Sequence, residues 1–171
     1  MKILEMRRQQ ILRLTLIILF GLAFIAPTTN AQNNLQGFSN MDKQIILNFV
    51  DAINEHNVDK ICSLMTDDHK FIDSQGNEVI GREKMRPGWI GYFHLFPDYK
   101  IEITDMFFNE DTVAAFGFAS GTFQGLSDRT GNYWRLPASW KAVVKDGRID
   151  LWQVYCDSKI PYDIMNESKK Q

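Results

Sequence analysis

The chain has 171 residues, 44% of them hydrophobic, and a formal net charge of −2 at pH 7. The length suits one domain, the hydrophobic content argues against a disordered chain, and the lack of a basic excess argues against nucleic acid as a partner. No run reaches the roughly 18 apolar residues that indicate a membrane-spanning helix.

The N-terminus has the pattern of a secretory signal peptide. A basic start is followed by an apolar run over residues 14–26, which is shorter than the roughly 20 residues of a spanning helix. Thr29 and Ala31 are small residues placed before a cleavage site at Gln32. We expect residues 1–31 to be removed and the product to be periplasmic or secreted, without a stable membrane span. An uncleaved N-terminal anchor is the alternative.

Two cysteines, Cys62 and Cys156, lie in the part that would remain. An oxidising compartment would permit a disulfide between them, and two buried free thiols are the alternative. Two cysteines cannot make a four-ligand zinc site, and the chain has no HxH or HExxH spacing. We therefore expect no metal site and no cofactor.

The first half of the mature chain has helical periodicity with one short hairpin. Apolar residues recur at three- and four-residue spacing over residues 42–56, which predicts a helix after a disordered leader at 32–41. A short helix at 59–65, a hairpin of strands at 70–73 and 78–80, and a helix at 83–93 follow.

The second half is strand-like. Alternation predicts strands at 99–108, 112–123, 133–144 and 148–157, with a loop at 125–131 and a C-terminal tail at 161–171. Helices that are segregated from a run of antiparallel strands indicate an α+β fold. A sheet curved around the helices would leave an apolar pocket at one end.

Several segments resemble the SnoaL-like polyketide cyclases of the NTF2-like, or ketosteroid isomerase-like, superfamily. They are INEHNVD at 53–59, LMTDDHKFID at 64–73, YFHLFPDY at 92–99 and the terminal hairpin from DGRI at 146–149 to Asp157. Gly81 stands where the third helix of that family begins. The resemblance covers roughly residues 42–160. It implies a cone in which a strongly bent antiparallel sheet wraps three N-terminal helices around a deep pocket, often in a homodimer.

The resemblance also implies candidate catalytic residues. Asp73 matches the proton-shuttling carboxylate of ketosteroid isomerase, and Asp157 matches the acid/base of the cyclases at the end of the last strand. A carboxylate can take a proton from carbon if burial raises its pKa. His94, at the end of the third helix, is a third candidate, because histidine titrates near neutral pH. Each of the three has a structural alternative. Asp73 could form a turn, Asp157 could cap the segment that follows it, and His94 could be a surface residue at the end of a helix.

The chain departs from ketosteroid isomerase at the two positions that stabilise an enolate there. The tyrosine position falls on Phe49, and the aspartate position falls on Trp140 or, with a different anchor, on Ser139. Phe49, Trp89, Trp140 and Tyr155 are therefore candidate ligand-binding residues, because aromatic walls suit a flat lipophilic ligand. Ordinary core packing is the alternative.

Three functions remain open from the sequence. The first is an exported enzyme that performs cofactor-free acid/base chemistry of an isomerase, cyclase or lyase type on a small lipophilic molecule. The second is a non-catalytic protein that binds such a molecule in the same pocket. The third is a homodimerising interaction domain.

Overall fold

The structure, a computed structural model, describes residues 29–125 and 131–168. The chain divides into two compact units, residues 1–36 and 37–171. The predicted signal peptide lies outside the described residues except for its last three positions. No helix in the described ranges is long and apolar enough to cross a membrane. The second unit is described below.

The helices are longer than the sequence pattern predicts. Helix α2 (Thr29–Asn54) begins well before residue 42, so the segment predicted to be a disordered leader is helical. That segment contains Gly37 but no proline, so a helix can continue through it, and its polar composition misled the prediction. Helix α5 (Lys159–Ser168) occupies most of the predicted C-terminal tail. Helices α3 (Val58–Ser63) and α4 (Arg82–Leu95) lie close to their predicted positions.

Six strands form one sheet in the order β2-β1-β6-β5-β4-β3, and together with the helices they confirm the predicted α+β fold. Neighbouring strands are antiparallel except for β1 and β6, which pair in parallel. The strands are β1 (Met65–Ile72), β2 (Glu78–Ile80), β3 (Lys100–Asn109), β4 (Thr112–Thr122), β5 (Tyr133–Lys145) and β6 (Arg148–Cys156).

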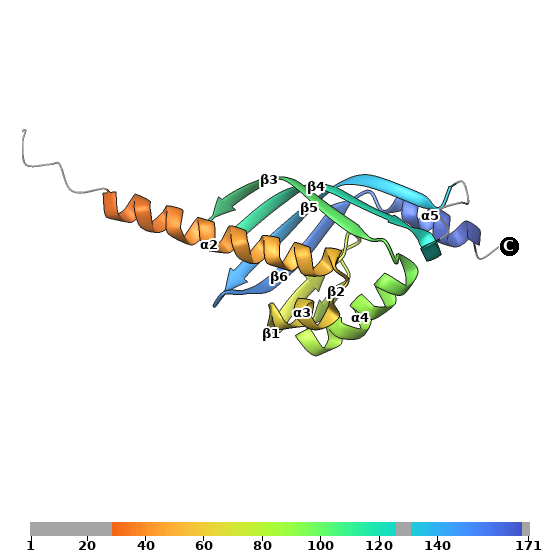
Figure 1. Cartoon of the computed structure of the whole chain (residues 1–171), viewed down its shortest axis with the longest axis horizontal. Coiled ribbons are helices and arrows are strands. Elements are labelled where there is room, and N and C mark those ends of the chain that lie inside the picture. Colours follow the sequence, from red (N-terminus) through yellow and green to blue (C-terminus); the bar gives the residue numbers. More distant parts are fainter. Residues whose placement is uncertain (1–28, 126–130, 169–171) are drawn as a thin grey trace, which may run out of the picture. The chain divides into compact units, whose positions relative to one another are not determined.

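The part of helix α2 that belongs to this unit, from residue 37 onward, covers one end of the inner face of the sheet (Figure 1). Phe49 meets the ring of Trp152 at 5.2 Å, and Trp152 stacks on Trp140 at 6.1 Å. The helix ends at Asn54, whose side-chain amide donates to the carbonyl of Ile101 and accepts from its N–H. This reciprocal pair ties the end of α2 to strand β3.

A bulge at Thr104 interrupts the pairing of β3 with β4. Ile103 pairs with Gly117 and Asp105 pairs with Phe116, so Thr104 is the extra residue. A β-carbon at Gly117 would lie 1.8 Å from the carbonyl oxygen of Glu102, so only glycine fits there. Bulges increase local bending and twist of a sheet, which is consistent with the curvature of these strands in Figure 1.

His69 on β1 is a fully buried polar side chain. Its Nδ1 donates to the carbonyl of Ile149 at 2.9 Å, because a carbonyl can only accept, and its Nε2 is buried without a partner. Burial lowers the pKa of His69, and the carbonyl of Ile149 and the charge of Asp150 offset this only in part. The imidazole is therefore neutral in the folded protein at neutral pH.

We predict that acid destabilises the fold through His69. A pKa that is lower in the folded state than in the unfolded state means that the unfolded chain binds the proton first. The free energy of unfolding should therefore be constant with pH well above 6.5 and should fall below it by up to about 1.4 kcal/mol per pH unit from this group. Urea unfolding monitored by circular dichroism between pH 5 and 8 would measure this.

Two variants separate His69 from other titrating groups. His69→Asn keeps a donor near the position of Nδ1 and should remove this part of the pH dependence. His94→Asn changes an exposed histidine and should leave the dependence intact. An unchanged pH profile in the His69 variant would contradict the prediction.

Candidate functional site

A cavity of about 340 Å³ lies where the inner face of the sheet meets helices α4 and α5. Most of its wall is aromatic or aliphatic. The residues that line it are Phe71, Asp73, Ser74, Val79, Lys84, Met85, Gly88, Trp89, Tyr92, Phe96, Tyr99, Ala119, Trp134, Leu136, Trp152, Val154, Cys156, Ser158, Pro161, Tyr162 and Met165.

Each wall of the cavity follows from a simple periodicity. Lys84, Gly88 and Tyr92 recur every four residues and place one face of α4 on the cavity. Trp134 and Leu136 alternate along β5, and Trp152, Val154 and Cys156 alternate along β6. Helix α5, which lies beside the short helix η1 (Phe123–Gly125), closes one end with Pro161, Tyr162 and Met165.

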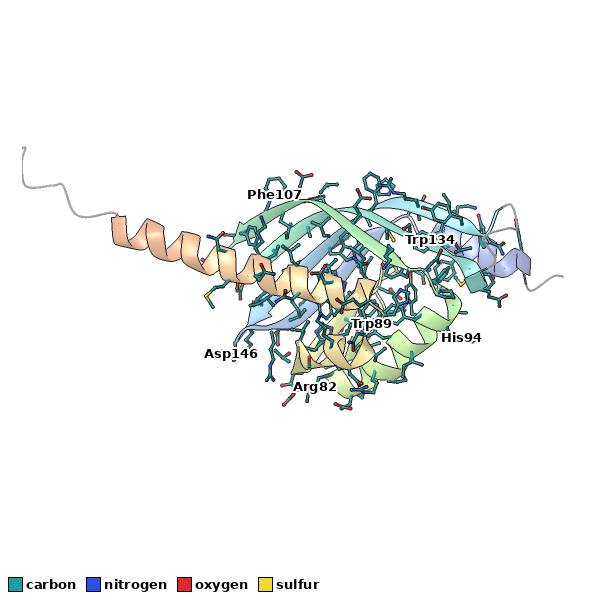
Figure 2. The ribbon with its side chains drawn as sticks, viewed as in Figure 1. Arg82, Trp89, His94, Phe107, Trp134 and Asp146 are labelled. Carbon is teal, nitrogen blue, oxygen red and sulfur yellow. The ribbon has the colours of Figure 1, made fainter. Side chains whose placement is uncertain are left out.

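Five rings form a continuous aromatic cluster along this wall. Trp89 meets Tyr92 at 6.3 Å, Tyr92 meets Tyr99 at 4.9 Å, and Tyr99 meets Trp134 at 6.2 Å. Phe96 packs edge-on against Trp134 at 5.5 Å. Figure 2 shows Trp89 and Trp134 coming from the helical side and the sheet side of the structure.

The hydroxyls of Tyr92 and Tyr99 hydrogen-bond to each other inside this cluster. Burial raises the pKa of both phenols. This bond raises the pKa of Tyr92 further and offsets part of the rise at Tyr99. Both side chains therefore stay protonated at neutral pH and can act only as hydrogen-bonding groups.

Cys156 adds a thiol to the cavity wall. It is a free cysteine, as is Cys62, so the structure agrees with the alternative of two unpaired thiols. Burial raises the pKa of Cys156, which also has a hydrogen bond with Ser74. The thiol is therefore protonated at neutral pH and is a weak nucleophile.

Asp73 lies at the cavity, as the sequence predicts, but its carboxylate is held within a turn. It accepts hydrogen bonds from the backbone N–H groups of Gln75 and Asn77 and from the side-chain amide of Asn77, at 2.8, 2.9 and 2.8 Å. Burial raises the pKa of Asp73, but these hydrogen bonds outweigh it, and the net pKa is below its usual value. The carboxylate therefore has the environment of a turn-forming residue rather than that of a strong base.

Asp157 and His94 do not reach the cavity. Asp157 is exposed and accepts from the backbone N–H of Lys159, where α5 begins. His94 is exposed on the last turn of α4 (Figure 2). The structure thus brings only one of the three candidate catalytic residues to the cavity, and the two aspartates do not share it.

Of the four candidate ligand-binding residues, only Trp89 lines the cavity. Phe49 on α2 and Trp140 on β5 are buried where the helix meets the sheet, and they form core with Trp152. Tyr155 is exposed, because β6 turns its side chain to the opposite face from Trp152.

Sequence reasoning missed several polar residues of the wall, among them Tyr92, Tyr99, Cys156 and Ser74. The four-residue spacing of Lys84, Gly88 and Tyr92 could have revealed one of these residues. The others depend on the pairing of distant strands, which no local pattern shows.

Across residues 29–125 and 131–168, no three histidine, cysteine or acidic side chains are placed to hold a metal ion.

Comparison with known proteins fits this architecture. Residues 46–152 match the sequence model of the SnoaL-like domain. The chain belongs to the SnoaL-like domain family. No protein of curated function matches it.

Solved structures share the fold of this SnoaL-like chain at low sequence identity. A proposed SnoaL-like polyketide cyclase from Shewanella denitrificans OS-217 has a TM-score of 0.63 and 16% identity, over 74% of this chain and 97% of that one. An LEH-like epoxide hydrolase from M. tuberculosis has a TM-score of 0.62 and 13% identity, over 77% of this chain and 93% of that one. AclR from Streptomyces galilaeus, a proposed hydroxylase, has a TM-score of 0.60 and 21% identity, over 74% of this chain and 96% of that one. These similarities confirm the fold and leave the activity open.

We predict that Asp73 contributes stability through its turn. Asp73→Ala removes the acceptor of three hydrogen bonds, so the free energy of unfolding should fall by about 1–2 kcal/mol. Asp68→Ala, which changes an exposed aspartate on β1, should alter it by no more than about 0.5 kcal/mol. Urea titration of both variants at pH 7 checks this, and equal stabilities would contradict the structural role.

Proposed function

We propose that this SnoaL-like protein binds a small lipophilic molecule in the cavity beneath α4 and α5. The observation that supports the proposal is the cavity itself, whose volume is in the range of small-molecule sites and whose wall is largely aromatic. Transfer of an apolar ring from water to such a wall is favourable in proportion to the area buried.

The polar groups of the wall favour binding over acid/base catalysis by the two predicted aspartates. Asp157 is exposed and away from the cavity, and the carboxylate of Asp73 has a lowered pKa and three hydrogen bonds. A general base for carbon acids works best with a pKa raised toward the working pH. The hydroxyls of Tyr92 and Tyr99 stay protonated and would orient a ligand.

We predict that filling the cavity abolishes binding. Ala119 lies on the wall, and Ala119→Phe would occupy space that the ligand needs. The probe is tetralin, an apolar two-ring hydrocarbon, titrated into the full chain by isothermal calorimetry. The wild-type chain should bind it saturably, and the variant should bind it at least tenfold more weakly.

Ala114→Phe is the matched control, because Ala114 lies on the same strand and pairs with Phe107 away from the cavity. It should bind tetralin like the wild-type chain. Circular dichroism would check that both variants unfold cooperatively. A wild-type chain without saturable tetralin binding would overturn the proposed function.

We also propose that the chain forms a homodimer through the outer face of its sheet. Phe107 and Phe116 are 63% and 44% exposed and meet edge-on at 5.9 Å. Phe116, Ser139 and Tyr155 form one row across three strands. Figure 2 places Phe107 on the face of the sheet away from α2 and α4. A clustered exposed aromatic surface of this kind is typical of a protein interface.

We predict that Phe116→Lys weakens this dimer, because it places a charge in an apolar contact. Light scattering after gel filtration at micromolar concentration should give a dimer for the wild-type chain and a monomer for the variant. Ile90→Lys, at an exposed apolar residue of α4, should remain dimeric. A monomeric wild-type chain would contradict the proposal.

A further inference from the structure

Helix α5 forms a wall of the cavity and lies outside the residues that match the SnoaL-like domain. The match ends at residue 152, and α5 begins at Lys159. Pro161, Tyr162 and Met165 of α5 line the cavity, and Figure 1 shows the helix at the end of the sheet where β6 ends. Most of the remaining wall comes from the sheet and from α4. The position of α5 over the cavity is therefore a feature of the C-terminal segment of this chain.

Helix α5 is packed on the core more lightly than helix α4. Three apolar residues of α4 are buried, namely Met85, Trp89 and Phe93. No residue of α5 between positions 159 and 167 is buried, and the side chains that pack this helix on the core, Ile164 and Met165, are half-buried. Elements with few buried apolar contacts open at a lower free energy than the rest of a fold. Helix α5 can therefore leave the core while α4 and the sheet stay folded.

The polar bonds at the start of α5 stay within its own segment, so an opening of the helix can keep them. Asp157 accepts from the backbone N–H of Lys159, and the ammonium of Lys159 pairs with Asp163 one turn later. The carbonyl of Ser158 accepts from the N–H of Tyr162. Asp157 and Ser158 lie between β6 and α5 and belong to neither. A short linker of this kind can act as a hinge, because a few residues absorb the change in backbone angles.

We propose that α5 is a lid, which swings outward about residues 157–158 to admit a ligand to the cavity and then closes over it. This inference rests on the proposed function for its ligand. The sheet and α4 cannot give way as easily, because Trp89, Phe96 and Trp134 of their walls belong to the buried core. Displacing α5 exposes only the half-buried contacts of Ile164 and Met165. A closed lid also slows release of a bound molecule, because the lid must reopen first.

Ile164→Ala tests the lid, because it weakens the packing of α5 without changing a residue that lines the cavity. The matched control is Ile160→Ala, the same change on the same helix at a side chain that is 46% exposed and also lies off the cavity wall. The probe is N-phenyl-1-naphthylamine, an uncharged dye whose fluorescence rises in apolar surroundings, mixed with the full chain by stopped flow. Ile164→Ala should raise the association rate constant about fivefold, because more molecules are open. Ile160→Ala should leave it unchanged.

Cys156 reports the opening of the lid without any ligand. It lines the cavity directly before the hinge, so its thiol should be more accessible when α5 is open. Cys62 is the internal control, because it is 3% exposed and does not line the cavity. The full chain is treated with iodoacetamide, and mass spectrometry follows each cysteine. Labelling of Cys156 should be about fivefold faster in Ile164→Ala than in the wild-type chain, and labelling of Cys62 should not change.

The outcomes separate the lid from the proposed function. An unchanged association rate constant or unchanged labelling of Cys156 in Ile164→Ala would overturn the lid, and α5 would then be a fixed wall of the cavity. Equal effects of Ile160→Ala, or equally faster labelling of Cys62, would show a general loosening of the fold and would overturn the lid as well. If the wild-type chain does not bind the dye saturably, the proposed function fails, and labelling of Cys156 alone then decides whether α5 opens.

Discussion

The side-chain amide of Asn54 anchors the end of helix α2 in this fold. By exchanging two hydrogen bonds with the backbone of Ile101, it holds that end against strand β3. The helix therefore covers only one end of the inner face of the sheet, where Phe49 meets Trp152. The other end is covered by α4 and α5, and the cavity lies beneath them.

The chemistry of the cavity follows from its low polarity. Burial raises the pKa of Tyr92, Tyr99 and Cys156, so these three groups keep their protons. Neutral hydroxyl and thiol groups recognise a ligand through directed hydrogen bonds and do not need a compensating charge. A wall of this kind selects its ligand by shape and by the position of its acceptors.

Periodicity predicted the faces of the elements but not their ends. Trp134, Leu136 and Trp140 alternate on β5, and the structure places all three on the inner face. Trp140 is core and Trp134 is cavity wall, and this difference does not follow from alternation along β5. The contact between residues 54 and 101, which anchors the end of α2, is likewise invisible in any local pattern. The parallel pairing of β1 with β6 is equally hidden, because Phe71 and Trp152 become neighbours only in the folded sheet. The family resemblance supplied the α+β cone, and it could not supply these long-range contacts.

The carboxylate of Asp73 is held within a turn, although the resemblance implied a catalytic role for it. A carboxylate beside an apolar cavity is costly unless its charge is satisfied, and a turn that offers several N–H groups satisfies it at once. The same hydrogen bonds lower the pKa of Asp73 and so weaken it as a base. A catalytic carboxylate needs the opposite arrangement, in which burial is left partly uncompensated and the pKa rises. The segment Asp73–Asn77 therefore favours a stable rim for a binding pocket over a proton-transfer site.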